Sequence, residues 1–221
     1  MPTQFVVDQT EKALRSYRKD ILFGWEKREQ DETTTRTLYI DKLVEKVFGY
    51  DIGLDVSMEQ RIRGQYADYV IRIGRKEYFV VEAKAINIDI NSNHLKQARQ
   101  YALDEGINWA VLTNGKQIEL YRVPDKATDD TIKVFSYDLS DLSQMKKAAE
   151  QMAYLTKKSL QKGELDAFWK KFDTLSKDNI AKALHTDDAI SAIRRQLKKS
   201  SGLYFAPDEI RKSLSQLLAD K

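Results

Sequence analysis

The sequence predicts an α/β fold in which a mixed β-sheet is flanked by helices and followed by an all-helical C-terminal module. Strand-like segments bounded by turn residues lie between about residues 54 and 137, with helical patterns on either side. After residue 140 the pattern is wholly helical. The 221 residues suffice for one large domain or two small ones. We therefore expect a core domain over 1–140 and a helical module over 141–221.

The composition restricts the chemistry that this chain can perform. It has no cysteine and two histidines, which excludes disulfides and thiolate catalysis and leaves little for histidine-bound zinc. Any metal site must therefore use oxygen ligands. No apolar run approaches the roughly 18 residues of a membrane span, so we expect a cytoplasmic protein without membrane contact.

The charge is unevenly distributed along the chain. Residues 141–221 hold 16 Lys and Arg against 11 Asp and Glu, whereas the preceding residues are slightly acidic. A basic C-terminal part fits a polyanionic partner. A solvated helical surface explains the same charge equally well.

Two helices are expected before the first strand, over residues 8–29 and 32–48. Apolar residues in the second recur close to the 3.6-residue helical period, and Gly49 is its expected C-cap. The strands 66–73 and 77–84 then flank the polar loop 74–76, which indicates a β-hairpin.

The next elements complete the sheet and lead into the helical module. A helix over 93–105 ends at Gly106, and strands over 109–113 and 117–123 are joined by an Asn114-Gly115 hairpin signal. A weaker strand covers 131–137. The helices expected in the module cover 142–158, 163–174, 178–184, 187–199 and 207–219.

The first hairpin carries the chemically informative residues. A three-residue loop at 74–76 pairs Ile73 with Glu77, which places Asp68 directly opposite Glu82. A loop one residue longer or shorter would put these carboxylates on opposite faces of the sheet. Two adjacent carboxylates suit a hard cation such as Mg²⁺, and Lys84 projects into the same space. The alternative is a simple acid–lysine pair on a solvated sheet face.

The same residues resemble a known family. Ala67-Asp68-Tyr69-Val70 and Val80-Val81-Glu82-Ala83-Lys84 resemble the Asp…Glu-x-Lys signature of the PD-(D/E)xK nuclease superfamily. With Gly64, the block 97–102 and the block 109–115, they resemble the N-terminal nuclease domain of type I restriction-enzyme R subunits and related stand-alone predicted restriction endonucleases. The resemblance covers roughly residues 30–123 and implies a restriction-endonuclease-like sheet. Ala67 replaces the family's proline, at a position without a chemical role.

The resemblance implies roles for individual residues. Asp68, Glu82 and the main-chain carbonyl of Ala83 would hold Mg²⁺, which Mn²⁺ could replace, and Lys84 would be the catalytic lysine. Gln97 and Tyr101 match a Gln-x-x-x-Tyr element and would act with them, although Tyr101 also suits a packed position on an amphipathic helix.

An additional acidic ligand is expected from upstream of the hairpin. Glu32 resembles the acidic residue that opens the family's first core helix and reaches the metal. The helix dipole alone also favours an acidic residue in a first turn. Glu59 is a second candidate, and the sequence does not decide between the two.

The expected function is Mg²⁺-dependent hydrolysis of DNA, in restriction or another defence against foreign DNA. The sequence lacks a Gly-x-x-x-x-Gly-Lys-Ser/Thr phosphate loop, so we expect the protein to act alone or with a separate motor or specificity partner. Analogy also suggests a homodimer. The rival is a non-catalytic module that uses the nuclease fold to bind DNA or protein, and a nuclease acting on RNA is a third candidate.

Overall fold

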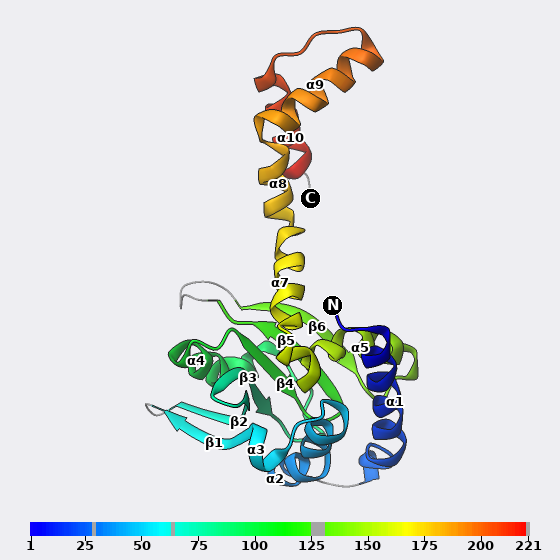
Figure 1. The fold of residues 1–221 in the computed structure, drawn as a ribbon, viewed down its shortest axis with the longest axis vertical. Helices are drawn as coiled ribbons and strands as arrows, with labels where there is room; N and C mark the ends of the chain where they lie inside the picture. The colour runs from blue at the N-terminus through cyan, green and yellow to red at the C-terminus, as the bar shows by residue number, and fades with distance from the viewer. Residues whose placement is uncertain (28–29, 63–64, 125–130, 220–221) are drawn as a thin grey trace. The chain divides into compact units, whose positions relative to one another are not determined.

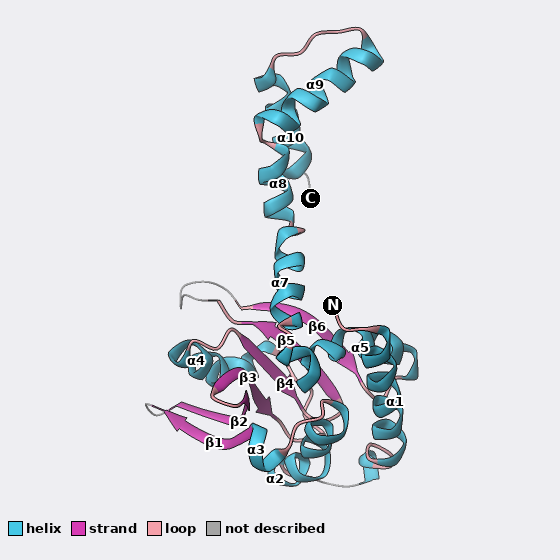
Figure 2. Cartoon of the chain, viewed as in Figure 1, coloured by secondary structure: helices cyan, strands magenta, loops and turns pink. Residues whose placement is uncertain are grey.

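A six-stranded mixed sheet forms the centre of the protein. The computed structural model describes residues 1–27, 30–62, 65–124 and 131–219 (Figure 1). Helices flank the sheet, and a helical region follows it, which confirms the α/β class expected from the sequence (Figure 2). The strands are β1 (Val56–Ile62), β2 (Gln65–Ile73), β3 (Lys76–Ala83), β4 (Trp109–Thr113), β5 (Gln117–Arg122) and β6 (Ile132–Asp138).

The strands lie side by side in the order in which they occur along the chain. All neighbouring pairs are antiparallel except β3 and β4, which are parallel. Parallel neighbours need a crossover connection. The crossover here contains a 3₁₀ turn (Ser92–Leu95) and helix α4 (Lys96–Glu105), which ends at Gly106 with a positive φ of 67°.

The β2–β3 hairpin has the register that the sequence predicts near the carboxylates, but a different loop. Ile73 pairs with Lys76 rather than with Glu77, so the loop has two residues. An irregularity after Ile71 then shifts the register by one residue, and Val70 pairs with Val80 as expected. A β-bulge of this kind adds one residue to one strand. The bulge therefore compensates for the shorter loop.

Successive residues of β2 face opposite sides of the sheet, and a different helix covers each side. Val70 belongs to a buried cluster with Ala98 and Tyr101 of α4. The hydroxyl of Tyr69 instead donates to Asp41 Oδ1 (2.8 Å), in the helical segment 32–47. Because strand side chains alternate, the segment 32–47 and α4 lie on opposite faces.

The two N-terminal helices are present with shifted limits. Helix α1 spans Gln4–Asp20 and buries Val6, Leu14 and Tyr17. The second consists of α2 (Glu32–Thr35) followed by two π-helical turns, Arg36–Ile40 and Leu43–Val47. Gly49 follows it with a φ of 78°, which agrees with the expected helix end.

The helix expected over 142–158 is interrupted before its end. Thr156 has an extended backbone, and its side chain caps the next helix by accepting a hydrogen bond from Ser159 N. The helices of the region are α5 (Met145–Met152), α6 (Lys157–Gln161), α7 (Glu164–Thr174), α8 (Lys177–Leu184), α9 (Asp187–Ser201) and α10 (Pro207–Ala219).

The chain divides into two compact units, Met1–Leu165 and Asp166–Lys221. This division falls later in the chain than the domain boundary expected at residue 140. Helix α5 buries Met145, Ala148 and Met152 and packs with α1, which places it in the first unit.

Candidate active site

Two of the carboxylates predicted for the site, Asp68 and Glu82, lie where β2, β3 and β4 run side by side. Tyr69 pairs with Val81, so the next pair in this register joins Asp68 to Glu82. Glu82 lies beside Leu112 of the parallel strand β4, and Lys84 N donates to Thr113 O (2.9 Å). The neighbouring strands therefore fix the backbone of the Glu-x-Lys segment on both sides.

The ammonium group of Lys84 lies at the centre of the site. Its Nζ is 2.7 Å from Glu82 Oε1, 2.6 Å from Ala83 O and 3.3 Å from Glu32 Oε2. Glu32 reaches this position as the first residue of α2, whose N-terminus is capped by the side chain of Asp31. Three of the four predicted metal ligands thus surround one cationic atom.

Asp68 completes the acidic cluster but binds different partners. Its Oδ2 accepts a hydrogen bond from Ala83 N (2.7 Å), which holds the carboxylate against the end of β3. Its Oδ1 lies 3.6 Å from Arg36 Nη1. The guanidinium group of Arg36 also lies over the Tyr69 ring, 5.2 Å from the ring centre. Arg36 therefore links the first π-helical turn to Asp68.

Burial and charge shift the proton affinities of Glu82 and Lys84. Glu82 is only 4% exposed. Its burial raises the pKa of Glu82 to about 7, although the hydrogen bond and charge of Lys84 act in the opposite direction. Burial alone would lower the pKa of Lys84, but Glu82, Glu32 and Asp68 together raise it above its ordinary value. Lys84 is therefore a cation at neutral pH, suited to offsetting negative charge rather than accepting a proton.

Helix α4 carries the other two predicted catalytic residues. Gln97 is exposed near the start of α4, and Tyr101 is 1% exposed within the cluster packed between α4 and the sheet. Burial, with the charges of Glu77 and Glu105, raises the pKa of Tyr101 to about 12. Glu77 lies near the start of β3, at the opposite end from Glu82. Tyr101 is therefore a packed residue of an amphipathic helix, which was the alternative to a catalytic role.

Side chains from distant elements hold the segment that follows Lys84. Thr35 Oγ1 accepts a hydrogen bond from Ile86 N (3.0 Å), and Asn114 Nδ2 donates to Ile88 O (2.8 Å). Thr35 and Asn114 are fully buried. The sequence does not reveal these contacts, because they join residues far apart in the chain. Asn114 is part of a hairpin signal and of the block 109–115 that carries the family resemblance.

The oxygen atoms around Lys84 fit a hard divalent cation in their chemistry. Carboxylate and carbonyl oxygens are the protein ligands that Mg²⁺ accepts, and Glu32, Glu82 and Ala83 supply them around one point. Over the described residues, no group of three or more Asp, Glu, His or Cys side chains is arranged to hold a metal ion. The Lys84 ammonium instead occupies the point where these oxygens meet. The side chain of Glu59, the other candidate, lies outside the described residues, as does Gly64.

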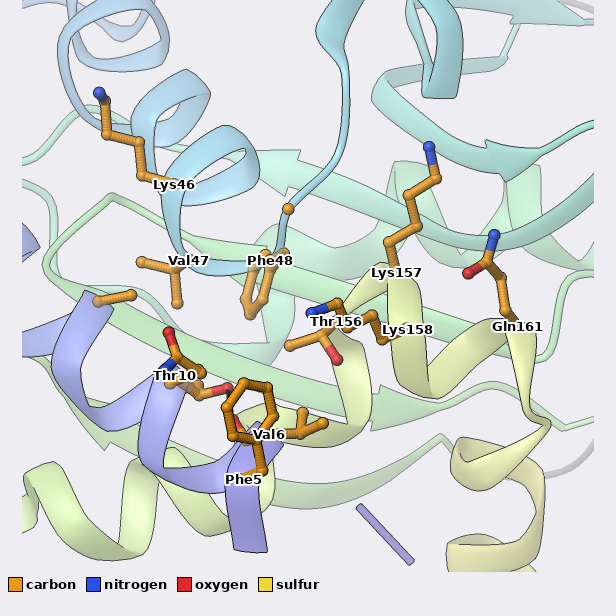
Figure 3. Close-up of a pocket in the computed structure, with 13 residues that line it drawn as sticks. Phe5, Val6, Thr10, Lys46, Val47, Phe48, Thr156, Lys157, Lys158 and Gln161 are labelled. Atoms are coloured by element: carbon orange, nitrogen blue, oxygen red, sulfur yellow. Dashed lines mark hydrogen bonds between the residues drawn. The ribbon is translucent and has the colours of Figure 1, made fainter. Parts of the chain in front are cut away.

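A separate pocket lies between α1, the end of the segment 32–47 and α6 (Figure 3). It has a volume of about 400 Å³ and contains none of the predicted catalytic residues. One of its lysines, Lys157, is 2.6 Å from Asp55 Oδ2, and Lys158 lies over the Phe5 ring. The segment 32–47 carries Glu32 at its start but contributes Lys46 and Val47, at its other end, to the pocket. The acidic cluster is therefore the better candidate for an active site.

The sheet and the Asp68–Glu82–Lys84 arrangement define a domain of the PD-(D/E)xK type. Residues 31–136 match the family model described as type I restriction enzyme R protein N terminus, so this segment is a domain of that family. The match covers a little under half of the chain and includes all residues of the acidic cluster. Neither the curated proteins nor the solved structures gave a match.

Among the helices of the described ranges, none is both long enough and apolar enough to cross a membrane.

Proposed function

We propose that this protein is a metal-dependent endonuclease that hydrolyses phosphodiester bonds of DNA. One observation carries the proposal: Glu82, Glu32 and the Ala83 carbonyl converge on the Lys84 ammonium, with Asp68 beside them. Phosphodiester hydrolysis by a PD-(D/E)xK-type domain requires two carboxylates on neighbouring strands and a lysine two residues after the second carboxylate. The matched family comes from restriction enzymes, which supports DNA as the substrate and defence as the role.

Each residue of the cluster has a distinct part in this proposal. Asp68, Glu82, Glu32 and the carbonyl of Ala83 would hold Mg²⁺, or Mn²⁺ in its place. When bound, the ion would supply positive charge for the phosphate and a polarised water. Lys84, kept protonated by the surrounding carboxylates, would offset the negative charge that develops on the phosphate. Arg36 would hold the orientation of Asp68.

We infer that any DNA translocation would be driven by a motor outside the matched segment 31–136, because these residues contain no phosphate loop. A homodimer, with one site for each DNA strand, is the assembly that analogy favours.

A plasmid-cleavage assay tests the proposed activity. The wild-type protein is incubated with Mg²⁺, Mn²⁺ or EDTA, alongside Lys84→Ala and the matched control Lys76→Ala. Lys76 is an exposed lysine at the start of the same strand, so its removal changes the charge equally without touching the cluster. We expect metal-dependent nicking that falls by at least about 100-fold in Lys84→Ala and persists in Lys76→Ala.

Two outcomes would contradict the proposal. Equal cleavage by the wild type and Lys84→Ala would place the activity elsewhere. No cleavage, together with no calorimetric heat of Mg²⁺ or Mn²⁺ binding with or without DNA, would favour the rival function, a non-catalytic module that binds DNA or protein.

A further inference from the structure

The second half of α9 and the loop after it form a basic stretch without acidic residues. Residues 189–207 include Arg194, Arg195, Lys198 and Lys199, and contain no Asp or Glu. We call these four residues the basic strip. The acidic residues of α9 lie in its first turn, where the helix dipole favours them. The dipole also favours Lys198 and Lys199 in the last turn, but it does not account for the two arginines at the middle of the helix.

Two cations of the basic strip meet at one exposed aromatic ring. The Arg194 guanidinium lies 5.1 Å from the centre of the Tyr204 ring, and the Lys198 ammonium lies 4.8 Å from it. Arg194 Nη2 also donates to the Tyr204 hydroxyl (3.1 Å). Tyr204 is 68% exposed, so this arrangement is on the surface. Tyr204 therefore holds two positive charges close together in a position that a ligand can reach.

This proximity of like charges is unfavourable without an anion. Arg194 with Lys198, and Arg195 with Lys199, are i,i+4 pairs of equal sign, which destabilise a helix. Within the described part of the chain, no carboxylate lies within ion-pair distance of the basic strip. Arg211 of α10 differs, because it is paired with Asp187 and with Asp208. Positive charge in this unit is thus neutralised at Arg211 and left available at the basic strip.

We propose that the basic strip and Tyr204 bind the phosphate backbone of duplex DNA, as a contact surface outside the nuclease cluster. Four cations in two adjacent rows suit a ligand with several phosphates, because each neutralised phosphate releases a counterion. Arginine and lysine contacts of this kind fix position on DNA without reading its sequence. Tyr204 is a positioning residue that keeps Arg194 and Lys198 side by side.

The salt dependence of DNA binding tests this surface. The full chain is titrated with a duplex of arbitrary sequence in EDTA over a range of salt concentrations, so that metal-dependent cleavage cannot contribute. We expect the Arg194→Gln/Lys198→Gln double variant to reduce the slope of log K against log salt by about 2. The matched control, Lys177→Gln/Lys182→Gln on α8, removes the same charge from exposed positions in the same unit and should leave the slope unchanged.

A second set of variants tests the positioning role. Tyr204→Ala should reduce the slope, whereas Tyr204→Phe keeps the ring and should stay close to the wild type. Circular dichroism confirms that each variant retains its helices. Equal effects of the strip and control double variants would overturn the proposal in favour of net charge alone. Unchanged DNA binding in the strip variant, with loss of binding to phosphatidylserine vesicles, would overturn it in favour of a membrane surface.

Discussion

At the scale of single residues, the candidate site depends on a buried carboxylate held next to a partly exposed ammonium. Glu82 and Lys84 are two residues apart on one strand end, and their side chains meet at 2.7 Å. Burial makes the charged form of Glu82 costly, while Lys84 stabilises it. The pKa of Glu82 therefore depends on the positive charge next to its carboxylate.

This balance predicts a pH dependence of stability without metal. The pKa of Glu82 is about 7 in the folded protein, against an ordinary value of 4.5, so the folded state binds this proton more tightly than the unfolded state. The contribution of Glu82 to the free energy of unfolding should therefore fall as pH rises from about 4.5 to 7. Glu82→Gln removes this contribution. The difference in the free energy of unfolding between the wild type and the variant should therefore change by about 1–3 kcal/mol between pH 4.5 and 7.

Urea denaturation in EDTA at several pH values measures this difference. The glutamine keeps an oxygen that can accept a hydrogen bond from Lys84, so the variant should fold. Parallel pH profiles for the wild type and the variant would show that burial does not shift the pKa of Glu82 as described.

At the scale of elements, the sequence predicted the hairpin register at the carboxylates but not how it arises. Alternation of apolar residues is a local property that assigns side chains to the two faces of each strand. The expected pairing of Asp68 with Glu82 depended in addition on a three-residue loop at 74–76, which the structure does not have. The two-residue loop and the compensating bulge depend on how β2 and β3 pair along their length. In the same way, Thr35 and Arg36 join the site only through contacts between α2, the first π-helical turn and the sheet. Periodicity does not reveal such contacts.

The β4–β5 hairpin gives a second example, because Asn114-Gly115 does more than turn the chain. Gly115 has a φ of 83°, and a Cβ added there would lie 2.6 Å from the Cβ of Tyr39. The Gly115 carbonyl also accepts a hydrogen bond from the Tyr17 hydroxyl (2.8 Å). This glycine therefore lets the hairpin approach α1 and the first π-helical turn closely.

Substitution of Gly115 should consequently be costly. We expect Gly115→Ala to lower the free energy of unfolding by about 2–4 kcal/mol, because it adds a steric clash to an unfavourable φ. Gly74→Ala is the matched control, since Gly74 has a φ of 63° but no atom within 4 Å of an added Cβ. Its cost should be only about 1–2 kcal/mol. Chemical denaturation compares the two, and equal costs would argue against the close contact with Tyr39.

At the scale of the whole molecule, the apolar core is concentrated in the first unit. Within the described residues, only Ile190 and Ile210 are buried hydrophobic side chains beyond Leu165. The charge shift near residue 140 marks where the sequence turns helical, but it does not mark where the core ends. Helix α5 lies beyond this point and still buries Met145 and Met152.

Two truncated proteins test whether the folded core ends near residue 140 or near residue 165. A fragment of residues 1–165 keeps α5 and α6, so we expect it to unfold cooperatively with a melting temperature within about 5 °C of the full chain. A fragment of residues 1–140 lacks the apolar face of α5 that packs with α1, and the newly exposed surface of α1 should make it aggregate or unfold at a much lower temperature. Thermal unfolding followed by circular dichroism, with size-exclusion chromatography, measures both. A stable, monomeric 1–140 fragment would show instead that the core domain ends where the charge changes and that α5 is dispensable to it.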